Sequence, residues 1–444
     1  MTAEILKPNK ETLKRAAEII KRGGLVAFPT ETVYGLGADA FNPKAVAKIF
    51  DVKNRSRFDP LIVHIADFKD VERLWHRVDE KAKLLMEKFW PCSLTLVLPK
   101  SDIVPDIVTA GLETVAIRMP SHPVALEFIK MTGVPIAAPS ANPFGYISPT
   151  EAIHVAEKIG DKIDLIIDGG KCSVGVESTV LEISEEPTVL RLGGMTIEEL
   201  EKVIGKLKIS TLSKKPRSPG QFSRHYSPWT PLKIIKGKID LPKGIKAGLL
   251  TFKNSKYDIP FEKIEVLSYK GDLIEAASNF FSYLHKLDSA GLDIIYAEPV
   301  PEIGLGRAIM DRLRKAEGIK MGKFATAINC IDGRVQIPVI ECIKNNYGVN
   351  YVDMITAPGV NKILAEGEHI IMELIKRCIG ISVNFHGSKL ITIVGHYDCA
   401  GNPTDKETQL KHILTAIKMV SSWGFNAKVI GLWVNEDWEV CEVE

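Results

Sequence analysis

The 444-residue sequence has no uninterrupted run of about 18 apolar residues, the length that a membrane-spanning helix requires. Its opening segment, MTAEILKPNKETLKRAAEIIKRGG, also lacks the apolar stretch of a secretory signal peptide. From these two absences we expect no contact with a membrane and a cytoplasmic location.

A large excess of charge is absent as well, since the formal net charge is +2. This value argues against the broad basic surface of a dedicated RNA-binding protein, although it does not exclude a nucleic acid as a partner. With 45% hydrophobic and 25% charged residues, the composition is that of a globular protein. The length predicts about three domains of roughly 150 residues each.

Cysteine is sparse, with seven residues in the whole chain, which is an odd number. Such a count does not suit a disulfide framework and favours metal binding or simple burial. Four of the seven fall in one region, namely Cys330, Cys342, Cys378 and Cys399. This clustering predicts a metal site in the last quarter of the chain.

Apolar runs alternate with helical patterns along the chain, which predicts an α/β protein. In the first part, a helix over residues 11–22 should end at Gly23 and Gly24. The runs suited to buried strands are 25–30, 61–66, 94–99, 115–120, 135–140, 165–170 and 179–184. We expect them to form one large mixed sheet.

A polar segment rich in Ser, Lys and Pro, residues 210–231, has the composition of a linker. Beyond it, a shorter alternation with helices over 272–290 and from about Arg307 predicts a small three-layer domain. The last part is again α/β, with helices over about 361–378 and 405–421 that flank a strand at 390–396.

Hydroxyl groups are concentrated in PTETVYGLG (29–37), where an apolar run leads into Thr30, Thr32 and Tyr34 and then into glycines. This pattern suits a small polar ligand, but a tight connection whose threonines cap a helix accounts for it equally well. The segments APSANPFGYISPT (138–150) and GGKCSVGVESTV (169–180) are also rich in Gly and short polar side chains. Ordinary turn chemistry is the alternative for both.

Three cations, Lys53, Arg55 and Arg57, alternate in DVKNRSR (51–57). In an extended segment they would share one face and suit a polyphosphate, whereas a solvated edge strand is the alternative. The chain contains no G-x-x-x-x-G-K-[ST] motif, so any ATP site would not be that of a P-loop fold.

Together these segments resemble the YrdC-type family, the threonylcarbamoyl-AMP synthases. The family's markers in this sequence are PTETVYGLG, K-x-R with PLIVHI, VAIRMPSHP, APSAN with ISPT, and ESTV. The linker and small second domain of the family's long form are matched by SPGQFSRHYSP (218–228) and EPVPEIGLGRAIMDRLRKA (298–316). The resemblance covers about residues 5–316. It implies synthesis of threonylcarbamoyl-AMP from L-threonine, bicarbonate or CO2 and ATP, with release of pyrophosphate, for N6-threonylcarbamoylation of an adenosine in tRNA.

The same resemblance assigns two sets of binding residues. Those for ATP are Lys53, Arg55, Asp59, Thr114, Ser140, Asn142, Ser148, Arg191 and Tyr226. Those for threonine are Thr32, His64, Arg118, Ala138 and Ser178. Tyr226 should fold over the bound ligand as a lid, and Arg118 is suited to bind a carboxylate. Mg2+ is expected with ATP, and positioning and charge neutralisation suffice because the reaction needs no protein nucleophile.

Two positions depart from the family pattern. Asp59 stands where Asn usually precedes Pro-Leu, and it would bring a negative charge near the phosphates unless it helps to hold Mg2+. Cys92 replaces the usual glycine of a WPG-type segment. Either change could alter affinity.

Two short motifs in the last part of the chain contain metal-binding residue types, C-x-D-x-R at 330–334 and H-x-x-C at 396–399. Cys330, His396 and Cys399 are a competent three-ligand set for zinc that leaves a fourth position for water. A buried Cys beside a strand-end His is the alternative for either motif alone. Both motifs in this order, about 66 residues apart, rarely arise by chance.

The pair of motifs resembles the β-carbonic-anhydrase family over about residues 324–444. Asp332 and Arg334 match the family's Asp–Arg pair, in which the Asp switches between binding zinc and hydrogen-bonding the zinc-bound water. The resemblance implies hydroxide on zinc that attacks CO2, and a site built across a dimer. The alternative is a domain in which zinc has only a structural role. Since the synthase consumes bicarbonate or CO2, we expect this domain to interconvert them.

The predicted fold is α/β throughout, in four segments. They are a YrdC-type domain with a large mixed sheet (1–208), a linker and lid (209–231), a small Rossmann-like domain (232–318) and a compact β-carbonic-anhydrase-like domain (324–444). We expect a homodimer through the last domain, and tRNA threonylcarbamoyltransferase machinery as the downstream partner.

Two other functions are compatible with parts of the sequence. One is a carbamoyltransferase of hydrogenase maturation, which shares the YrdC-type fold, but neither an acylphosphatase-like unit nor paired C-x-x-C motifs are present. The other is an RNA-binding module with a structural zinc domain. The near-neutral charge and the hydroxyl-rich loops favour a small-molecule pocket over that second reading.

Overall fold

The computed structural model divides the chain into two compact units, Met1–Ile319 and Lys320–Glu444. It describes residues 2–213, 216–222, 225–239, 241, 244–254, 257, 259–317, 323–367, 369–384 and 386–443. Residues 214–215 and 223–224, which belong to the predicted linker and lid, lie outside this range. Among the described residues, no helix has both the length and the apolar character needed to span a membrane.

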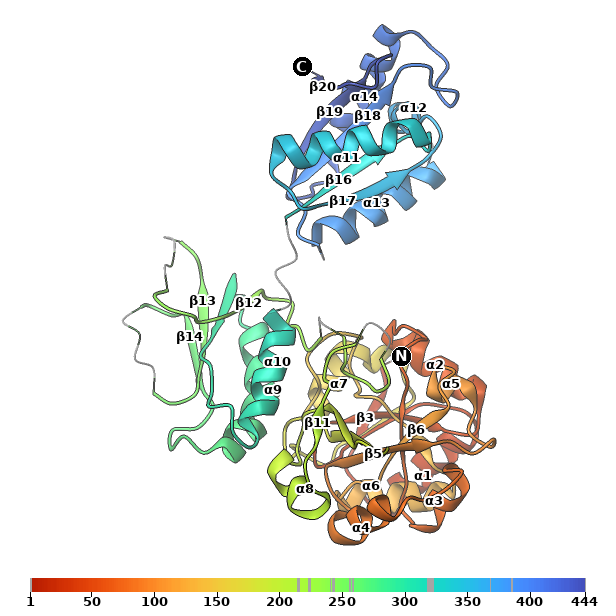
Figure 1. The fold of residues 1–444 in the computed structure, drawn as a ribbon, viewed down its shortest axis with the longest axis vertical. Helices are drawn as coiled ribbons and strands as arrows, with labels where there is room; N and C mark the ends of the chain where they lie inside the picture. The colour runs from red at the N-terminus through yellow and green to blue at the C-terminus, as the bar shows by residue number, and fades with distance from the viewer. Residues whose placement is uncertain are drawn as a thin grey trace. The chain divides into compact units, whose positions relative to one another are not determined.

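The first unit contains an eleven-stranded sheet in the order β1-β8-β2-β3-β7-β4-β6-β5-β9-β10-β11. Strands β3, β5, β6 and β11 of this sheet are labelled in Figure 1. The strands are β1 Glu4–Leu6, β2 Val26–Phe28, β3 Gly35–Asp39, β4 Ile62–His64, β5 Leu94–Pro99, β6 Thr114–Arg118, β7 Ile136–Ala137, β8 Leu165–Ile167, β9 Thr179–Glu182, β10 Thr188–Arg191 and β11 Lys208–Ile209. Parallel and antiparallel pairs are mixed, as predicted. Most strands are shorter than their apolar runs because the runs continue into the turns that follow.

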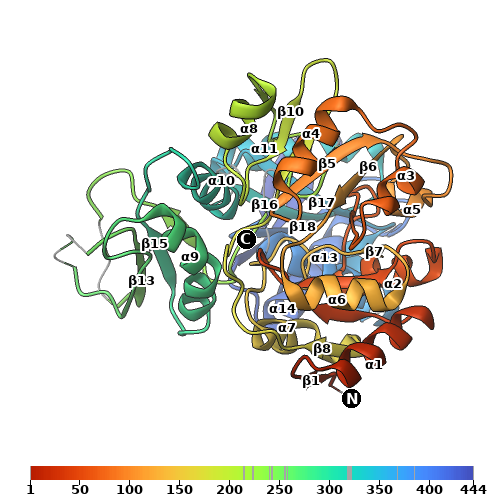
Figure 2. The same cartoon turned by 90° about the horizontal axis from the view of Figure 1, so that it is seen from below.

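Eight α-helices are described around this sheet. They are α1 Lys10–Lys21, α2 Pro43–Lys53, α3 Lys69–Leu74, α4 Glu80–Phe89, α5 Asp106–Thr109, α6 Pro123–Thr132, α7 Ala152–Ile159 and α8 Ile197–Ile204, with a 3-10 turn at Gly160–Lys162. The sequence of α1 accounts for its position. Asn9 caps the helix by accepting a hydrogen bond from the Thr12 amide at 2.8 Å. Its apolar stripe (Leu13, Ala16, Ala17 and Ile20) is buried, and the helix packs beside α6 (Figure 2).

The segment that contains the three alternating cations is not extended, so the prediction of one shared cationic face is wrong. Helix α2 ends at Lys53, and Asn54 follows in the left-handed conformation with a φ of 51°. The helix end and this turn send the side chains in different directions. Lys53 and Arg55 are buried, whereas the Arg57 side chain is 69% exposed.

A smaller sheet completes the first unit, with four parallel strands in the order β12-β15-β13-β14. Its elements are β12 Leu232–Ile234, β13 Ala247–Thr251, β14 Lys263–Val266, α9 Leu273–Asp288, β15 Ile294–Ala297 and α10 Gly306–Glu317. Both helices pack on the same face, in a core that also includes Tyr146 and Val176 from the larger domain. The predicted three-layer arrangement is therefore wrong, since loop residues such as Tyr257 and Phe261 cover the other face.

The second unit is a five-stranded sheet in the order β17-β16-β18-β19-β20, in which only β20 is antiparallel. Its elements are β16 Phe324–Asn329, α11 Gly333–Tyr347, β17 Tyr351–Thr356, α12 Val360–Glu366, α13 His369–Asn384, β18 Leu390–His396, α14 Lys406–Ser422, β19 Lys428–Val434 and β20 Val440–Val443. Helix α11 covers one face of the sheet, and α12, α13 and α14 cover the other. The single helix predicted over 361–378 is wrong, because Gly367 ends α12 with a φ of 82°.

Candidate active site and metal centre

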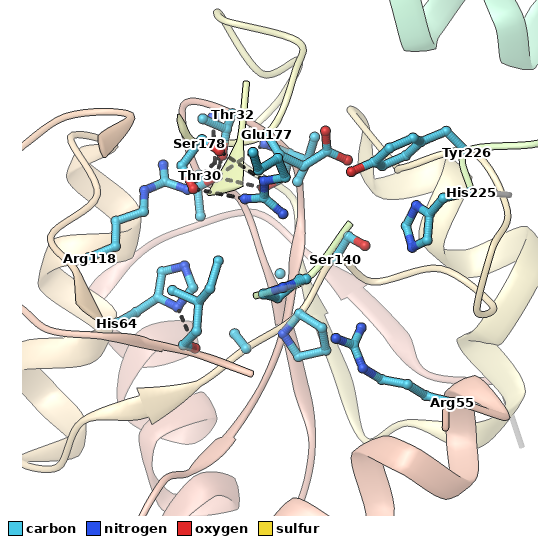
Figure 3. Close-up of a pocket in the computed structure, with 17 residues that line it drawn as sticks. Thr30, Thr32, Arg55, His64, Arg118, Ser140, Glu177, Ser178, His225 and Tyr226 are labelled. Atoms are coloured by element: carbon cyan, nitrogen blue, oxygen red, sulfur yellow. Dashed lines mark hydrogen bonds between the residues drawn. The ribbon is translucent and has the colours of Figure 1, made fainter. Parts of the chain in front are cut away.

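A polar pocket lies in the first unit where β4 and β6 end. His64 and Arg118 close these two parallel strands and are register partners in the sheet. The pocket is lined by Thr30, Thr32, Val33, Gly35, Arg55, Ile62, His64, Arg118, Ala138, Pro139, Ser140, Glu177, Ser178, Arg191, Pro219, His225 and Tyr226. Figure 3 shows Arg118 and His64 at one end, and Arg55, His225 and Tyr226 at the other. Residues far apart in the sequence therefore share one cavity.

The pocket brings together nine of the fourteen residues predicted for the two substrates. All five predicted for threonine line it, as do Arg55, Ser140, Arg191 and Tyr226 from the ATP set. Outside the lining are Lys53, Asp59, Thr114, Asn142 and Ser148. Thr114 begins β6, four residues and roughly 13 Å along the strand from Arg118, so the structure does not bring it to the pocket.

At one end of the pocket, the Arg118 guanidinium is held by its neighbours. It donates to the Thr32 hydroxyl at 2.8 Å and pairs with the Glu31 carboxylate at 2.5 Å, and both charged residues are buried. Its Nε lies 3.4 Å from the backbone carbonyl of Cys92. Because Arg118 contacts the main chain of Cys92, the replacement of the usual glycine by cysteine at this position does not remove the contact. Burial raises the pKa of the Cys92 thiol to about 12, which keeps the thiol neutral.

At the other end, Lys53 and Asp59 shape the pocket from behind its lining. The Asp59 carboxylate is fully buried and pairs with Arg55 at 2.8 Å, so its charge is neutralised within the protein. Lys53 donates to the carbonyl oxygen of Ser140 at 2.5 Å and to that of Asn142, which fixes the 140–142 loop. Burial, with the charge of Arg55 second, lowers the pKa of Lys53.

The sequence prediction missed Glu177, which lines the pocket. Its carboxylate accepts a hydrogen bond from the Ser148 hydroxyl and pairs with Arg312 of α10 at 2.9 Å. Burial opposes ionisation of Glu177, but Arg312 and Arg191 outweigh that effect and lower its pKa. Glu177 and Arg312 both lie in segments that match the family, ESTV and DRLRKA. Their place in these segments was the sequence signal that could have identified them as site residues. Thr30 and His225, which are also outside the two predicted sets, line the pocket as well.

Tyr226, the residue predicted to act as a lid, lines the pocket in this structure. It is 1% exposed and has a φ of 61°, in the left-handed region that a tyrosine rarely adopts. Among the described residues, neither its hydroxyl nor Nδ1 of His225 has a hydrogen-bond partner. The remaining cavity has a volume of about 40 Å³. Ligand sites for small molecules offer about 300 Å³ or more, so a ligand that needs such a volume fits only if residues of the lining move.

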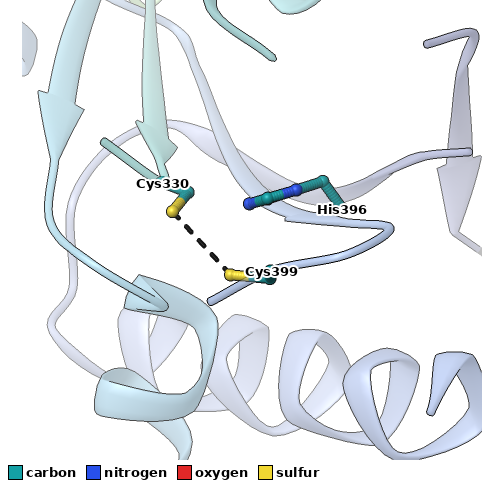
Figure 4. A group of neighbouring side chains, drawn as sticks. All are labelled: Cys330, His396 and Cys399. Carbon is teal, nitrogen blue, oxygen red and sulfur yellow. Dashed lines mark hydrogen bonds between the residues drawn. The ribbon is translucent and has the colours of Figure 1, made fainter. Parts of the chain in front are cut away.

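A second candidate site lies in the other unit, where Cys330, His396 and Cys399 meet (Figure 4). All three are buried, and their ligand atoms lie within 4.8 Å of one another. His396 donates from Nδ1 to the Tyr397 carbonyl at 2.7 Å, which leaves Nε2 buried and without a partner among the described residues. A hydrogen bond between the sulfurs lowers the pKa of Cys330 and raises that of Cys399. Two sulfurs and a free imidazole nitrogen fit zinc.

The predicted Asp–Arg pair lies beside this cluster. Asp332 caps α11, and Arg334 donates to its carboxylate at 2.6 and 3.0 Å. These hydrogen bonds lower the pKa of Asp332 to about 2, so the carboxylate stays ionised. The Arg334 guanidinium lies 4.7 Å from the centre of the Trp438 ring. A cavity beside the cluster is lined by Cys399 and by polar side chains such as Lys406.

Comparison with known proteins gives matches along the chain. Residues 18–193 match a family model described as "Telomere recombination", residues 195–318 one described as "Threonylcarbamoyl-AMP synthase, C-terminal domain", and residues 320–444 one described as "Putative carbonic anhydrase". The threonylcarbamoyl-AMP synthase of Pyrococcus abyssi is 46% identical over 325 residues, which cover 70% of this chain and 95% of that protein. The synthase of Bacillus subtilis is 44% identical over 328 residues, with the same two coverages.

The solved structure of a relative also aligns with most of this chain. The crystal structure of P. abyssi Sua5 complexed with L-threonine aligns with a TM-score of 0.66 at 43% sequence identity. The alignment covers 71% of this chain and 97% of that one.

We expect His64 to make the stability of the first unit depend on pH. Burial, together with Arg118, lowers the pKa of His64 from 6.5 to about 3. Between these values the unfolded chain binds the proton more readily than the folded one, so stability is lost as pH falls from 6.5 towards 3. The slope contributed by one histidine is at most about 1.4 kcal/mol per pH unit.

His64→Gln should therefore flatten the dependence of the urea denaturation midpoint on pH over this window. His76→Gln, at an exposed position outside the pocket, is the matched control and should keep the parent slope. An unchanged slope in His64→Gln would contradict a buried, neutral His64.

Proposed function

The chain belongs to the threonylcarbamoyl-AMP synthase family, and on that premise we propose that its first unit makes threonylcarbamoyl-AMP from L-threonine, bicarbonate or CO2 and ATP, with release of pyrophosphate. The observation that carries the proposal is one pocket with Arg118 and Thr32 at one end and Arg55 and Tyr226 at the other. The product would serve N6-threonylcarbamoyladenosine formation in tRNA through a downstream transferase. Segments 1–208, 209–231, 232–318 and 324–444 are the proposed domains.

We assign threonine to the Arg118 end of the pocket. The guanidinium binds the substrate carboxylate, while Glu31 and Thr32 hold it in position. His64, kept neutral by its low pKa, adds no charge at this end. The threonine complex of the P. abyssi relative supports a threonine site in this fold.

The chemistry needs only positioning and charge neutralisation. The threonine amine attacks the carbon of CO2 and loses a proton to water, which gives a carbamate. With bicarbonate, the amine proton and the bicarbonate hydroxyl leave together as water. A carbamate oxygen then bonds to the α-phosphorus of ATP as the bond between that phosphorus and pyrophosphate breaks. Arg55 and Arg191 face the phosphates and neutralise the charge that shifts to pyrophosphate. Mg2+, bound with ATP, would neutralise a further share of the phosphate charge.

For the second unit, we propose that Cys330, His396 and Cys399 hold zinc and that the domain interconverts CO2 and bicarbonate for the synthase. Zinc held there would lower the pKa of a bound water to about 7. The Tyr397 carbonyl fixes the His396 ring so that Nε2 faces the metal position. Arg334 keeps Asp332 ionised and oriented, ready to accept a hydrogen bond. A structural zinc domain is the alternative.

We also propose that a second copy of the chain docks on the second unit. Strand β17 lies at the edge of its sheet, and the adjoining helix α13 exposes apolar side chains. Their exposed fractions are 85% for Ile370, 61% for Leu374 and 45% for Ile381. A sheet edge beside an apolar helix can pair with its own copy about a twofold axis, which buries both.

The synthase proposal predicts pyrophosphate release from ATP that requires both threonine and bicarbonate. Arg118→Gln removes a charge-assisted contact of roughly 1.5–3 kcal/mol, so KM for threonine should rise by about 10- to 100-fold and KM for ATP much less. Arg77→Gln, at an exposed position, is the control. If the parent chain binds RNA but releases no pyrophosphate, the RNA-binding alternative is favoured.

The zinc proposal predicts one zinc ion per chain, lost in Cys399→Ser and retained in Cys342→Ser, a half-buried cysteine outside the cluster. The synthase rate of Cys399→Ser should fall several-fold at limiting CO2 and recover at saturating bicarbonate. Full zinc content in Cys399→Ser would reject the metal site. Loss of zinc with an unchanged rate at limiting CO2 would reject the coupling of the two activities.

The dimer proposal predicts a sedimenting species of two chains that Leu374→Glu converts to one. Leu414→Glu, at a 40% exposed position on α14 of the same unit, is the control and should stay dimeric. A monomeric parent chain, or a dimeric Leu374→Glu variant, would exclude this surface.

A further inference from the structure

Arg312 of α10 joins the small domain to the pocket of the larger one. Its side chain is fully buried, and its Nη2 and Nε atoms lie 2.9 and 3.1 Å from the Glu177 carboxylate. A third nitrogen donates to the carbonyl of Leu192. The guanidinium also lies 5.1 Å from the centre of the Tyr226 ring. One side chain thus contacts both a wall of the pocket and the lid that closes it.

The same turn of α10 holds the lid by its backbone. Lys315 donates from Nζ to the carbonyl of Gly220 at 2.8 Å, and its own carbonyl accepts the His225 amide at 3.2 Å. Asp311 pairs with Arg312 at 3.2 Å and with Lys315 at 2.9 Å. Lys315 therefore connects this helix turn to the described part of the lid by two hydrogen bonds.

The lid is packed tightly in a conformation that needs support. Tyr226 has a φ of 61°, and its relaxed conformations lie elsewhere. A Cβ atom added at Gly220 would lie 2.5 Å from the Tyr226 hydroxyl, so the glycine allows the ring to seat against the lid. Without the guanidinium against its ring, Tyr226 would lose a contact that holds this conformation.

Charge gives Arg312 a second role. Glu177 is the one carboxylate among the described residues that line the pocket, and an unpaired carboxylate there would repel the phosphates of a nucleotide. Arg312 neutralises it from outside the lining. An arginine of the small domain therefore makes the pocket suitable for an anion.

We propose that Arg312 is a positioning residue that couples closure of the lid over the pocket to neutralisation of Glu177, which makes the small domain a working part of the nucleotide site. The identity of the anion as ATP rests on the proposed function. The latch itself, defined by Arg312, Glu177 and Tyr226, stands on the contacts in this structure.

The test compares Arg312→Gln, Arg312→Lys, Glu177→Gln and the double variant Glu177→Gln/Arg312→Gln. Arg314→Gln, on the same helix but with a 54% exposed side chain, is the matched control. Arg312→Gln should raise KM for ATP at least about tenfold and change KM for threonine less, because it leaves Glu177 unpaired. The double variant should have a KM for ATP closer to that of the parent chain. It removes both charges, so no unpaired carboxylate remains in the pocket. The KM for ATP of Arg312→Lys should lie between those of the parent chain and Arg312→Gln, because lysine keeps the charge but loses the planar contact to the Tyr226 ring.

Lid closure is measured without substrates, from the rate of trypsin cleavage after Arg217 located by mass spectrometry. Cleavage should be faster in Arg312→Gln than in the parent and Arg314→Gln chains. Parent values of KM and cleavage rate in Arg312→Gln would overturn the proposal, and so would a double variant no better than Arg312→Gln. If Arg312→Gln fails to fold, the ATP KM and cleavage rate of Arg312→Lys decide, with parent values rejecting the latch. If the parent chain releases no pyrophosphate, the proposed function fails, whereas the cleavage rates still test the latch.

Discussion

Desolvation of charge is the constraint on which the rest of the first unit depends. A pocket for a polyphosphate needs cations, but a buried cation is costly unless a partner compensates it. Three arginines at this pocket are each paired with a buried carboxylate: Arg118 with Glu31, Arg55 with Asp59 and Arg312 with Glu177. The pairs hold the arginines in place before any ligand arrives, so a ligand meets donors that are already oriented. The same need for partners draws α10 of the small domain against the larger one.

The sequence allowed much of this fold to be predicted, because the controlling interactions are local or periodic. Apolar runs in the sequence indicate buried strands, and β5 matches its predicted bounds at Leu94–Pro99. The substrate residues came from resemblance, and the structure gathers nine of them in one pocket, although their roles remain proposals. The cluster of Cys330, His396 and Cys399 followed from ligand chemistry, and the structure brings the three together.

What could not be predicted depends on single backbone conformations or on long-range partners. Asn54 adopts the left-handed conformation and so separates Arg57 from the other two cations, which no alternation of charges could reveal. Gly367 divides one helical pattern into α12 and α13 in the same way. The role of Glu177 depends on Arg312, which is 135 residues away in the sequence and in another domain. Only the folded chain shows that Asp59 is neutralised by Arg55.

With Tyr226 seated against the pocket, the cavity has a volume of about 40 Å³, far below the roughly 300 Å³ or more of a small-molecule site. On the proposed function, a nucleotide would bind only to molecules in which the lid is open. Measured nucleotide affinity would then be the intrinsic affinity scaled by the fraction of molecules that are open. A substitution that opens the lid but leaves Glu177 paired would therefore tighten apparent nucleotide binding, because more molecules could admit the ligand.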